Sequence, residues 1–491
     1  MSEKSLRVRY APSPTGLQHI GGIRTALFNY LYARNMGGDF ILRIEDTDRT
    51  RFFEGALEDI FSTFEWLGIT YDEGPVKNGK FAPYFQSERL ELYQKYVKEL
   101  VEKGAAYYCY CDSDRLEKVR KTQEANRLPP GYDRHCRELS QNELEENKKK
   151  GITPVIRFKA PLTGTTSFDD RILGKIEVDN KTLQDFVLLK SDGFPTYHLA
   201  NIVDDHIMEI TDVLRAQEWV PSTPNHILLY KAFSWQPPKF CHLPMVMGED
   251  GHKLSKRHGS THVIEFRNSG YLPEAIINFV SLLGWSCNDK EELFLLEELT
   301  KVFDINRINK APAIFNYSKL KWFNGVYIRK LTIDKLAEMT LPHYKLAKLI
   351  SENSTDEEFN YLKKVLPLIR DRLELINDAP ELSDFMFGLL PPYKTWSEII
   401  PKNVEKGMVI KILEDALEIL KDIETRPHKE LQDSLYKLAE KYNVKVGAIF
   451  MPIRIAITGI NKSPELFPVM EILGKERVVE RIKASINKLR E

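Results

Sequence analysis

The sequence predicts an α/β protein that ends in a long helical region. Two observations lead to this prediction. The chain opens with a strand, a turn, a helix and a second strand, and from about residue 265 onward apolar residues recur at helical spacing with few glycines. A chain of 491 residues also exceeds one ordinary hydrophobic core, so we expect two to five domains.

The opening elements form a βαβ pattern. Residues 5–10 alternate as in a strand, and apolar residues at helical spacing begin at Ile23. Gly37 and Gly38 follow, where the C-terminus of a helix commonly needs glycine. The run FILRIED (40–46) is expected to be the second strand, joined to the first by a right-handed crossover.

The middle of the chain predicts an inserted domain at about 93–203. Helices are expected near 54–67 and 87–103. They precede three short strand-like runs separated by polar loops: AAYYCYC (105–111), VIRFKA (155–160) and GKIEVDN (174–180). We interpret LEENKKKG (144–151) as a solvated linker.

After residue 203 the α/β pattern returns. In STPNHILLYKAF (222–233), Thr223 is expected to cap a helix and Pro224 to occupy its first helical position. The strand-like run HLPMVM (242–247) then leads into the basic loop KLSKR (253–257).

Composition is that of an ordinary globular protein, with 42% apolar and 29% charged residues. The net charge of −1 excludes a strongly basic tail, but 70 Lys and Arg residues can still gather on one face and bind nucleic acid. The first residues do not resemble a signal peptide, and no apolar run reaches the ~18 residues of a membrane span. Five cysteines, an odd number, argue against a disulfide framework. We therefore expect a cytoplasmic protein.

Two segments carry candidate chemistry. RYAPSPTGLQHIGG (9–22) places a glycine-rich turn before a helix, and such a turn can hold phosphate against free backbone N–H groups. It matches neither the Walker loop nor the dinucleotide fingerprint, so a plain structural turn is the alternative. GEDGHKLSKRHGS (248–260) groups Lys253, Lys256, Arg257 and His258, and by itself it is typical of a solvated basic loop.

Together these segments resemble a known family. HIGG (19–22) resembles the HIGH motif of class I aminoacyl-tRNA synthetases, and KLSKR resembles their KMSKS loop. The chain departs from these motifs at Gly22, Leu254 and Arg257. Four longer strings resemble bacterial glutamyl-tRNA synthetases in the family's order: APSPTG, RIEDTDR, LLKSDGFPTYHLANIVDDH and LRAQEW.

The resemblance implies a class I Rossmann-type catalytic domain with an inserted α/β acceptor-binding domain and an all-α anticodon-binding region. The expected ranges are the catalytic halves 1–92 and 204–250, the acceptor-end-binding insert 93–203, the KLSKR loop and stem-contact domain 251–330, and helical anticodon-binding domains at 331–388 and 389–491.

It also implies the reaction. Glutamate is activated by ATP, accompanied by Mg²⁺, to glutamyl-adenylate and is then transferred to the 3′-terminal ribose of tRNA(Glu). Activation is expected to require tRNA, and a monomer is the family default. The alternatives are a non-discriminating enzyme that also charges tRNA(Gln), a glutaminyl-tRNA synthetase, a small-molecule nucleotidylyltransferase and an inactive RNA-binding protein.

By resemblance, His19, Lys253 and Lys256 stabilise charge in the catalytic step, with Lys256 the most important. The residues implied for ATP are Ser13, Gly16, His19, Gly21, Gly22, Glu218, Lys253, Leu254, Ser255, Lys256 and Arg257. The residues implied for glutamate are Arg9, Ala11, Ser13, Glu45, Tyr197, Asn201, Arg215 and Trp219. Glu45 is expected to take the ammonium, and the arginines are suited to carboxylates. Surface ion pairs for the arginines and core packing for Tyr197 are the alternatives.

Three thiols in the insert are typical of a structural zinc site. Cys109 and Cys111 face the same side of a strand, and Cys136 follows in GYDRHCRE. Zinc needs a fourth ligand, for which we favour Tyr132 over the competing His135 and Glu138. Three buried thiols without metal are the alternative.

Two C-terminal segments are candidates for tRNA contact. FNYSKLKWFNGVYIRK (315–330) interleaves basic and aromatic residues, which indicates either a contact with the tRNA stem or the core of a small helical domain. Arg372 in LIRDRLEL aligns with a family position that reads the third anticodon base. An exposed helical arginine is the alternative.

Overall fold

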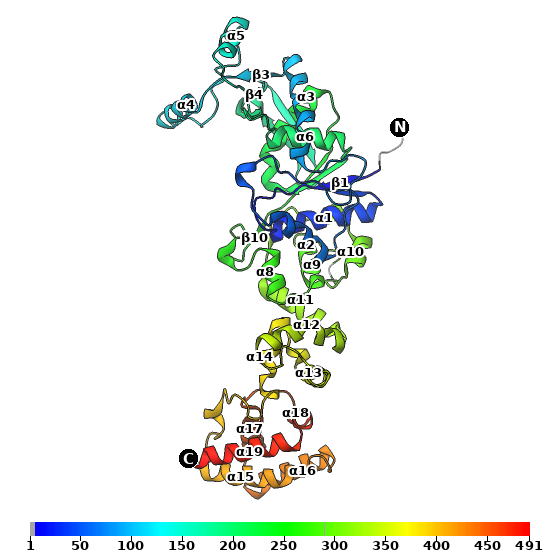
Figure 1. Ribbon diagram of the computed structural model, residues 1–491, viewed down its shortest axis with the longest axis vertical. Coiled ribbons are helices and arrows are strands. Elements are labelled where there is room, and N and C mark those ends of the chain that lie inside the picture. The colour runs from blue at the N-terminus through cyan, green and yellow to red at the C-terminus, as the bar shows by residue number, and fades with distance from the viewer. Residues whose placement is uncertain (1–4, 289) are drawn as a thin grey trace. The chain divides into compact units, whose positions relative to one another are not determined.

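The computed structural model describes residues 5–288 and 290–491. Contacts divide the chain into two compact units (Figure 1). The first runs to Asn268 and adds Pro273–Tyr317, and the second comprises Ser269–Leu272 and Ser318–Glu491. The finer division into five domains stays a prediction. Within the described ranges, no helix is long and apolar enough to cross a membrane.

The predicted βαβ pattern is confirmed. Strand β1 (Arg7–Tyr10) pairs in parallel with β2 (Asp39–Leu42), and helix α1 (Ile20–Met36) connects them and lies against β1 (Figure 1). Gly37 ends the helix with a left-handed φ of 63°, the conformation that favours glycine. The two helices expected next are α2 (Ala56–Leu67) and α3 (Leu90–Glu102).

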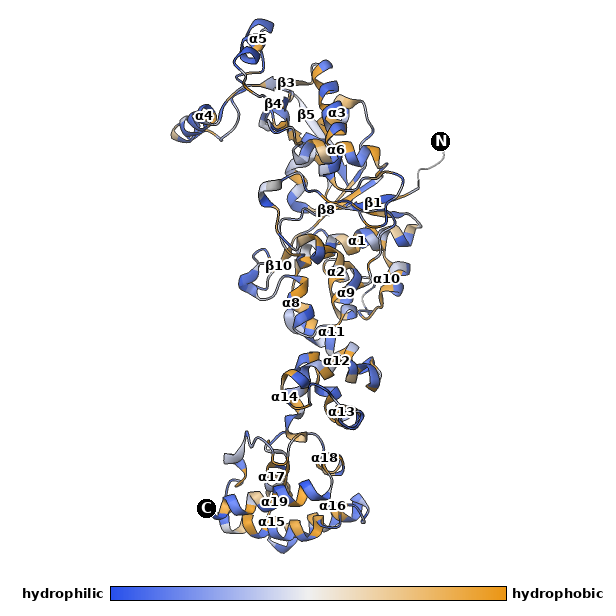
Figure 2. Cartoon of the chain, viewed as in Figure 1, coloured by the Kyte–Doolittle hydropathy of each residue, from blue (hydrophilic) through white to orange (hydrophobic). Residues whose placement is uncertain are grey.

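The first part of the insert forms a small antiparallel sheet in the order β3–β4–β7, with strands Ala106–Cys109, Val155–Phe158 and Val187–Leu189. Helices α4 (Ser113–Ala125) and α5 (Gln141–Lys149) bury none of their side chains and are largely hydrophilic (Figure 2).

The interpretation of 144–151 as a linker is wrong, because α5 occupies most of it. Ser140 and Glu143 close a capping box at the start of α5 and satisfy N–H groups there. The segment is solvated, as expected, but helical.

A second sheet has the order β6–β5–β9–β8. Strands β8 (Asp212–Ala216) and β9 (Lys239–Leu243) pair in parallel, and β5 (Thr165–Asp170) pairs with β6 (Gly174–Asp179) as a hairpin. The hairpin meets β9 at a single pair, Asp170 opposite Phe240. The sheet therefore crosses the boundary expected at residue 203.

Helix α6 (Tyr197–Ile207) precedes β8, and α7 (Thr223–Phe233) follows it. The expectation that Thr223 caps α7 is wrong. Ser222 occupies the cap position without a side-chain bond, and the Thr223 hydroxyl accepts from Arg215 Nη2 at 2.8 Å instead.

The rest of the first unit contains a short parallel pair, β10 (Val246–Met247) and β11 (Ala313–Ile314). Its remaining helices are α8 (Val263–Asn268), α9 (Pro273–Ser281) and α10 (Leu296–Val302).

The helical C-terminal region is confirmed. Its helices are α11 (Tyr317–Lys330), α12 (Ile333–Leu346), α13 (Asp356–Ile369), α14 (Ala379–Ser383), α15 (Lys406–Leu420), α16 (His428–Lys441), α17 (Val446–Thr458), α18 (Leu466–Leu473) and α19 (Lys475–Arg490). On α11, Phe323 and Tyr327 are buried, whereas Trp322 and Lys321 are exposed. One face of α11 therefore packs in the core, and another face exposes basic and aromatic side chains.

Candidate active site

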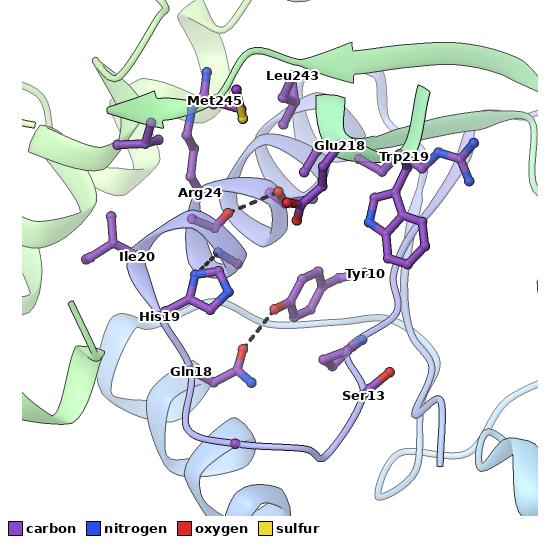
Figure 3. A pocket seen from close by; sticks show the side chains of 18 of the residues that line it. Tyr10, Ser13, Gln18, His19, Ile20, Arg24, Glu218, Trp219, Leu243 and Met245 are labelled. Atoms are coloured by element: carbon purple, nitrogen blue, oxygen red, sulfur yellow. Dashed lines mark hydrogen bonds between the residues drawn. The ribbon is translucent and has the colours of Figure 1, made fainter. Parts of the chain in front are cut away.

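The two motif segments lie at one cavity of about 690 Å³ in the first unit. Ile20 N donates to Thr261 O at 3.0 Å and Val263 N donates to Gln18 O at 2.9 Å, so backbone hydrogen bonds join the turn to the chain just after the basic loop. Figure 3 shows Tyr10, His19 and Glu218 pointing toward one space from different elements.

Nearly all residues predicted for ATP and glutamate line this cavity. From the turn and α1 come Arg9, Ala11, Ser13, Gly16, His19, Gly21 and Gly22; from later elements come Glu45, Tyr197, Asn201, Arg215, Glu218, Trp219, Lys253, Leu254, Ser255 and Lys256. Arg257 does not line it, and its Nη2 contacts Asp250 at 3.3 Å. The structure brings the set together; the role of each residue stays a prediction.

His19 caps α1 in a way that fixes its proton. Its Nδ1 accepts from Gly22 N at 3.1 Å, so the neutral ring carries its hydrogen on Nε2. Desolvation and the nearby His262 lower the pKa of His19, which keeps the ring neutral near pH 7. A Cβ at Gly22 would lie 2.8 Å from the Tyr10 hydroxyl, so a larger residue there would require Tyr10 to shift.

Arg9 is the third residue of β1 and is already paired inside the protein. Its Nε and Nη2 donate to the two carboxylate oxygens of Asp205 at 3.0 and 3.2 Å. Arg43 also donates to Asp205, at 2.7 Å, and reaches Glu45 at 3.3 Å. Burial acts to raise the pKa of Asp205, but Arg9 and Arg43 hold it below its usual range. The charge of Arg9 is therefore balanced without a ligand.

Arg215 is held differently, although it is only 5% exposed. Its guanidinium donates to neutral partners: His242 Nε2 at 3.0 Å, the Tyr197 hydroxyl at 3.0 Å and the Thr223 hydroxyl at 2.8 Å, with His226 Nδ1 at 3.3 Å. Among the residues that the structure describes, no carboxylate forms an ion pair with it within 4.0 Å. A buried cation without an anion makes the cavity attractive to a carboxylate.

The cavity has a second, solvent-exposed cationic part on the basic loop. Lys253 Nζ contacts Glu218 Oε2 at 2.6 Å, and both side chains are about half exposed or more. The ring of Trp219 packs on Tyr197 with a centroid separation of 4.4 Å. One part of the cavity is thus suited to a buried carboxylate, and the other offers lysines to a polyanion.

Comparisons with known proteins decide the family. Residues 5–322 match the catalytic-domain model of class I tRNA synthetases (E and Q), and residues 335–486 match an anticodon-binding-domain model. Over 489 residues the chain is 53% identical to the glutamate–tRNA ligase of Borreliella burgdorferi, covering 99% of both. The chain belongs to the glutamate–tRNA ligase family. The ligase of Treponema denticola is 50% identical over 503 residues, covering 98% of this chain and 99% of that relative.

A solved structure agrees with this assignment. The crystal structure of a glutamate–tRNA ligase from Elizabethkingia meningosepticum, in complex with its amino acid, superimposes with a TM-score of 0.89 at 35% identity, covering 99% of this chain and all of that one. The predicted class I fold and activity are confirmed: the enzyme joins glutamate to tRNA. A glutaminyl-tRNA synthetase is not favoured.

The three predicted thiols of this ligase converge. The sulfur atoms of Cys109, Cys111 and Cys136 lie within 4.8 Å of one another. The Tyr132 hydroxyl lies 3.3 Å from Cys109 Sγ and 3.7 Å from Cys111 Sγ. Glu138 is instead exposed, and its carboxylate contacts Lys159 at 3.2 Å.

In the second unit of the ligase, Arg372 donates to the backbone carbonyls of Lys462 and Ser463 at 3.1 and 2.9 Å. Arg454 also donates to the Ser463 carbonyl, at 3.3 Å, and the proximity of Arg372 together with burial lowers the pKa of Arg454. Two guanidinium groups therefore meet at one loop.

Sequence reasoning missed several partners. Asp205, His242 and His226 were not singled out, although Asp205 lies within the quoted NIVDDH string and His242 begins HLPMVM. The sequence carried no signal that places His242 beside Arg215, because the pairing of β8 with β9 brings them together.

Proposed function

We propose that this cavity holds glutamate and ATP side by side for the adenylation step of the ligase. Arg215 takes the side-chain carboxylate of glutamate, because its charge has no protein carboxylate beside it. Glu45 takes the ammonium, with Asn201 donating to Glu45 at 3.4 Å. The other proposed glutamate contacts are Arg9, Ala11, Ser13, Tyr197 and Trp219.

The triphosphate lies between the turn and the basic loop. The proposed ATP contacts are Ser13, Gly16, His19, Gly21, Gly22, Glu218, Lys253, Leu254, Ser255, Lys256 and Arg257, with ATP bound as its Mg²⁺ complex. Arg257 reaches the nucleotide only after leaving Asp250. The single observation that carries the proposal is that both motif segments line one cavity.

In the first step, an oxygen of the glutamate α-carboxylate attacks the α-phosphorus, and the bond to pyrophosphate breaks. His19 Nε2–H, the positive N-terminal end of the α1 dipole, Lys253 and Lys256 stabilise the negative charge that grows on the leaving pyrophosphate. In the second step, a terminal ribose hydroxyl of tRNA attacks the activated carbonyl, and AMP leaves. Neither step requires a protein nucleophile.

ATP–pyrophosphate exchange with glutamate, measured with and without tRNA(Glu), tests this proposal. We expect exchange only when tRNA is present. Exchange that is absent in both conditions, in a preparation that still binds tRNA, contradicts the proposed cavity.

We further propose that Cys109, Cys111, Cys136 and Tyr132 hold a structural zinc ion. Ligand sulfurs around a tetrahedral zinc lie about 3.8 Å apart, from Zn–S bonds of about 2.3 Å. The 3.5 Å between the sulfurs of Cys111 and Cys136 fits this spacing. Zinc would cross-link the strand end to the following loop and supply no catalytic chemistry.

Metal analysis of the purified enzyme tests the zinc site. We expect one zinc per chain, lost in Cys111→Ser and kept in Cys287→Ser, a cysteine outside the cluster. Enzyme that carries no zinc yet folds and is active contradicts the site.

The partner tRNA(Glu) is proposed to contact Arg372 with its anticodon. Arg372→Ala should lower kcat/KM for tRNA by about tenfold, as loss of one base contact does. Arg490→Ala, an exposed arginine paired with Glu414, is the matched control. Equal effects of both variants contradict an anticodon role. A cytoplasmic monomer completes the proposal, and sedimentation at the mass of one chain tests the oligomeric state.

A further inference from the structure

Arg215 has an anion nearby, but an imidazole lies between them. The parallel pairing of β8 and β9 places His242 directly beside Arg215. His242 Nε2 lies 3.0 Å from Arg215 Nε, and His242 Nδ1 lies 2.7 Å from Asp170 Oδ2. All three side chains are buried, and those of His242 and Asp170 are fully so.

The proton positions in this chain are fixed by chemistry. A guanidinium N–H only donates, so His242 Nε2 must accept, and the proton of the neutral ring sits on Nδ1 and is donated to Asp170. Burial lowers the pKa of His242, which agrees with a neutral ring. Burial acts to raise the pKa of Asp170, but its bond to His242 and two backbone N–H groups hold it low.

Both carboxylate oxygens of Asp170 also accept hydrogen bonds from backbone N–H groups. Its Oδ1 accepts from Ile172 N at 3.0 Å and Leu173 N at 2.9 Å, and its Oδ2 accepts from His242 N at 3.0 Å. These bonds lie where the β5–β6 hairpin meets β9. The hairpin therefore fixes the orientation of His242, and His242 fixes the plane of Arg215.

The contrast with Arg9 shows what the intervening imidazole achieves. Asp205 contacts Arg9 directly with both oxygens and neutralises it. Asp170 orients Arg215 through a neutral ring, so the guanidinium is held in place and its charge remains available to a ligand. A direct carboxylate would compete with the substrate carboxylate for the same N–H groups.

We propose that Asp170 and His242 are positioning residues that hold Arg215 for the side-chain carboxylate of glutamate and so set the preference for glutamate over glutamine. This inference rests on the proposed function of Arg215. Neither positioning residue touches the substrate; both act through the guanidinium.

The test is steady-state aminoacylation at saturating tRNA, with KM measured separately for glutamate and ATP and with glutamine as competing substrate. His242→Phe keeps a ring of similar size but has no nitrogen. We expect it to raise the KM for glutamate by about tenfold to a hundredfold, as loss of a hydrogen bond to a charged group does. The KM for ATP should stay within about twofold, and the preference for glutamate over glutamine should fall.

Two further variants separate positioning from packing. His242→Gln offers one donor and one acceptor, so it should recover part of the glutamate KM that His242→Phe loses. Asp170→Asn places an amide N–H against either His242 or two backbone N–H groups, so it should behave like His242→Phe. Asp212→Asn is the matched control, because Asp212 is a buried aspartate of the same sheet that pairs with Arg171 at 2.9 Å. It should leave both KM values unchanged.

Arg215→Met distinguishes a failure of the positioning role from a failure of the proposed function. If Arg215→Met raises the glutamate KM while His242→Phe and Asp170→Asn do not, the positioning role is wrong and the binding role of Arg215 stands. If Arg215→Met leaves the glutamate KM unchanged, the proposed function is wrong. Equal rises in both KM values, together with a lower melting temperature than Asp212→Asn, would indicate general damage and overturn the inference.

Discussion

The two halves of the cavity differ in how firmly their side chains are held. In the half proposed to bind glutamate, the glutamate half, Arg9 and Arg215 are 3% and 5% exposed, and their N–H groups donate to buried partners. In the half proposed to bind the triphosphate, the triphosphate half, Lys253 and Lys256 are exposed on the basic loop, and Lys253 contacts the half-exposed Glu218. The first half is organised before substrate arrives, which suits selectivity. The exposed side chains of the second half must rearrange when the triphosphate binds. Such side chains can follow the negative charge that develops during the reaction.

Removing Arg215 tests the organised half most severely. Arg215→Met should lower kcat/KM for glutamate by about 10³–10⁴, because a buried charged pair is lost. It should change the KM for ATP by far less. Arg9→Ala should also raise the KM for glutamate more than that for ATP, but by a smaller factor, because Asp205 already neutralises Arg9. An Arg9 effect larger than the Arg215 effect would reverse the assigned roles.

Lys256 gives the corresponding test of the exposed half. Lys256→Ala should lower kcat by about 10²–10³, the usual cost of removing one donor to a developing charge. The KM for glutamate should stay nearly constant, since Lys256 is proposed to contact the nucleotide and not glutamate. Lys256→Arg should recover part of the rate, and Lys239→Ala, an exposed lysine at the start of β9, is the control. If Lys256→Ala lost activity only because its KM for glutamate rose, the assignment of Lys256 to the triphosphate half would be wrong.

How far the sequence predicts the site also differs between the halves. Most of the triphosphate half comes from two continuous strings, 9–22 and 253–257, and their resemblance to the HIGH and KMSKS motifs is what predicted their chemistry. The glutamate half depends on strand pairing, because the parallel pairing of β8 with β9 brings His242 beside Arg215. A local sequence pattern predicts a strand but not which strand pairs with it. The sequence therefore did not indicate that His242 and Asp170 lie beside Arg215.

The same limit explains the errors elsewhere. Thr223 has the residue type and position of a cap, but the buried guanidinium of Arg215 competes for its hydroxyl. In 144–151, charge suggested a linker, while the capping box formed by Ser140 and Glu143 just before it indicated a helix. The fold class, the opening βαβ unit and the helical C-terminal region were predictable because long, periodic patterns specify them.

Acid should destabilise the organised half. Burial lowers the pKa of His198 to about 4, and its Nδ1 lies 3.2 Å from His226 Nε2. The unfolded chain, with an ordinary histidine pKa near 6.5, binds more protons between these values. Stability is therefore complete above pH 6.5 and falls as the pH drops toward 4, by about 2 kcal/mol at pH 5.

Thermal unfolding at pH 7.5 and pH 5.0 measures this effect. His198→Gln keeps a hydrogen-bonding side chain without a titrating group, so its melting temperature should fall less between the two pH values than that of the wild type. His428→Gln, a substitution on the surface of the second unit, should behave as the wild type. A pH response of His198→Gln equal to that of the wild type would contradict a half-buried, neutral His198.

The smallest expected effect concerns the contact between Glu218 and Lys253. Both side chains are at least half exposed, so their pair contributes little to stability, on the order of 0.2–1 kcal/mol. Glu218→Gln keeps a polar side chain in the cavity but removes a negative charge beside the triphosphate and releases Lys253. We expect the KM for ATP to fall about twofold to fivefold, more at low salt than at high salt, because exposed charges are screened.

Lys253→Met in the same assay should raise the KM for ATP, and the double variant should match Lys253→Met alone if Glu218 acts through the lysine. Independent, additive effects would show instead that Glu218 does not act through Lys253. Both results test whether the side chains of the triphosphate half are less firmly held than those of the glutamate half. A carboxylate that restrains a lysine until ATP arrives explains why one half stays adaptable, whereas Asp205 holds Arg9 permanently in the other.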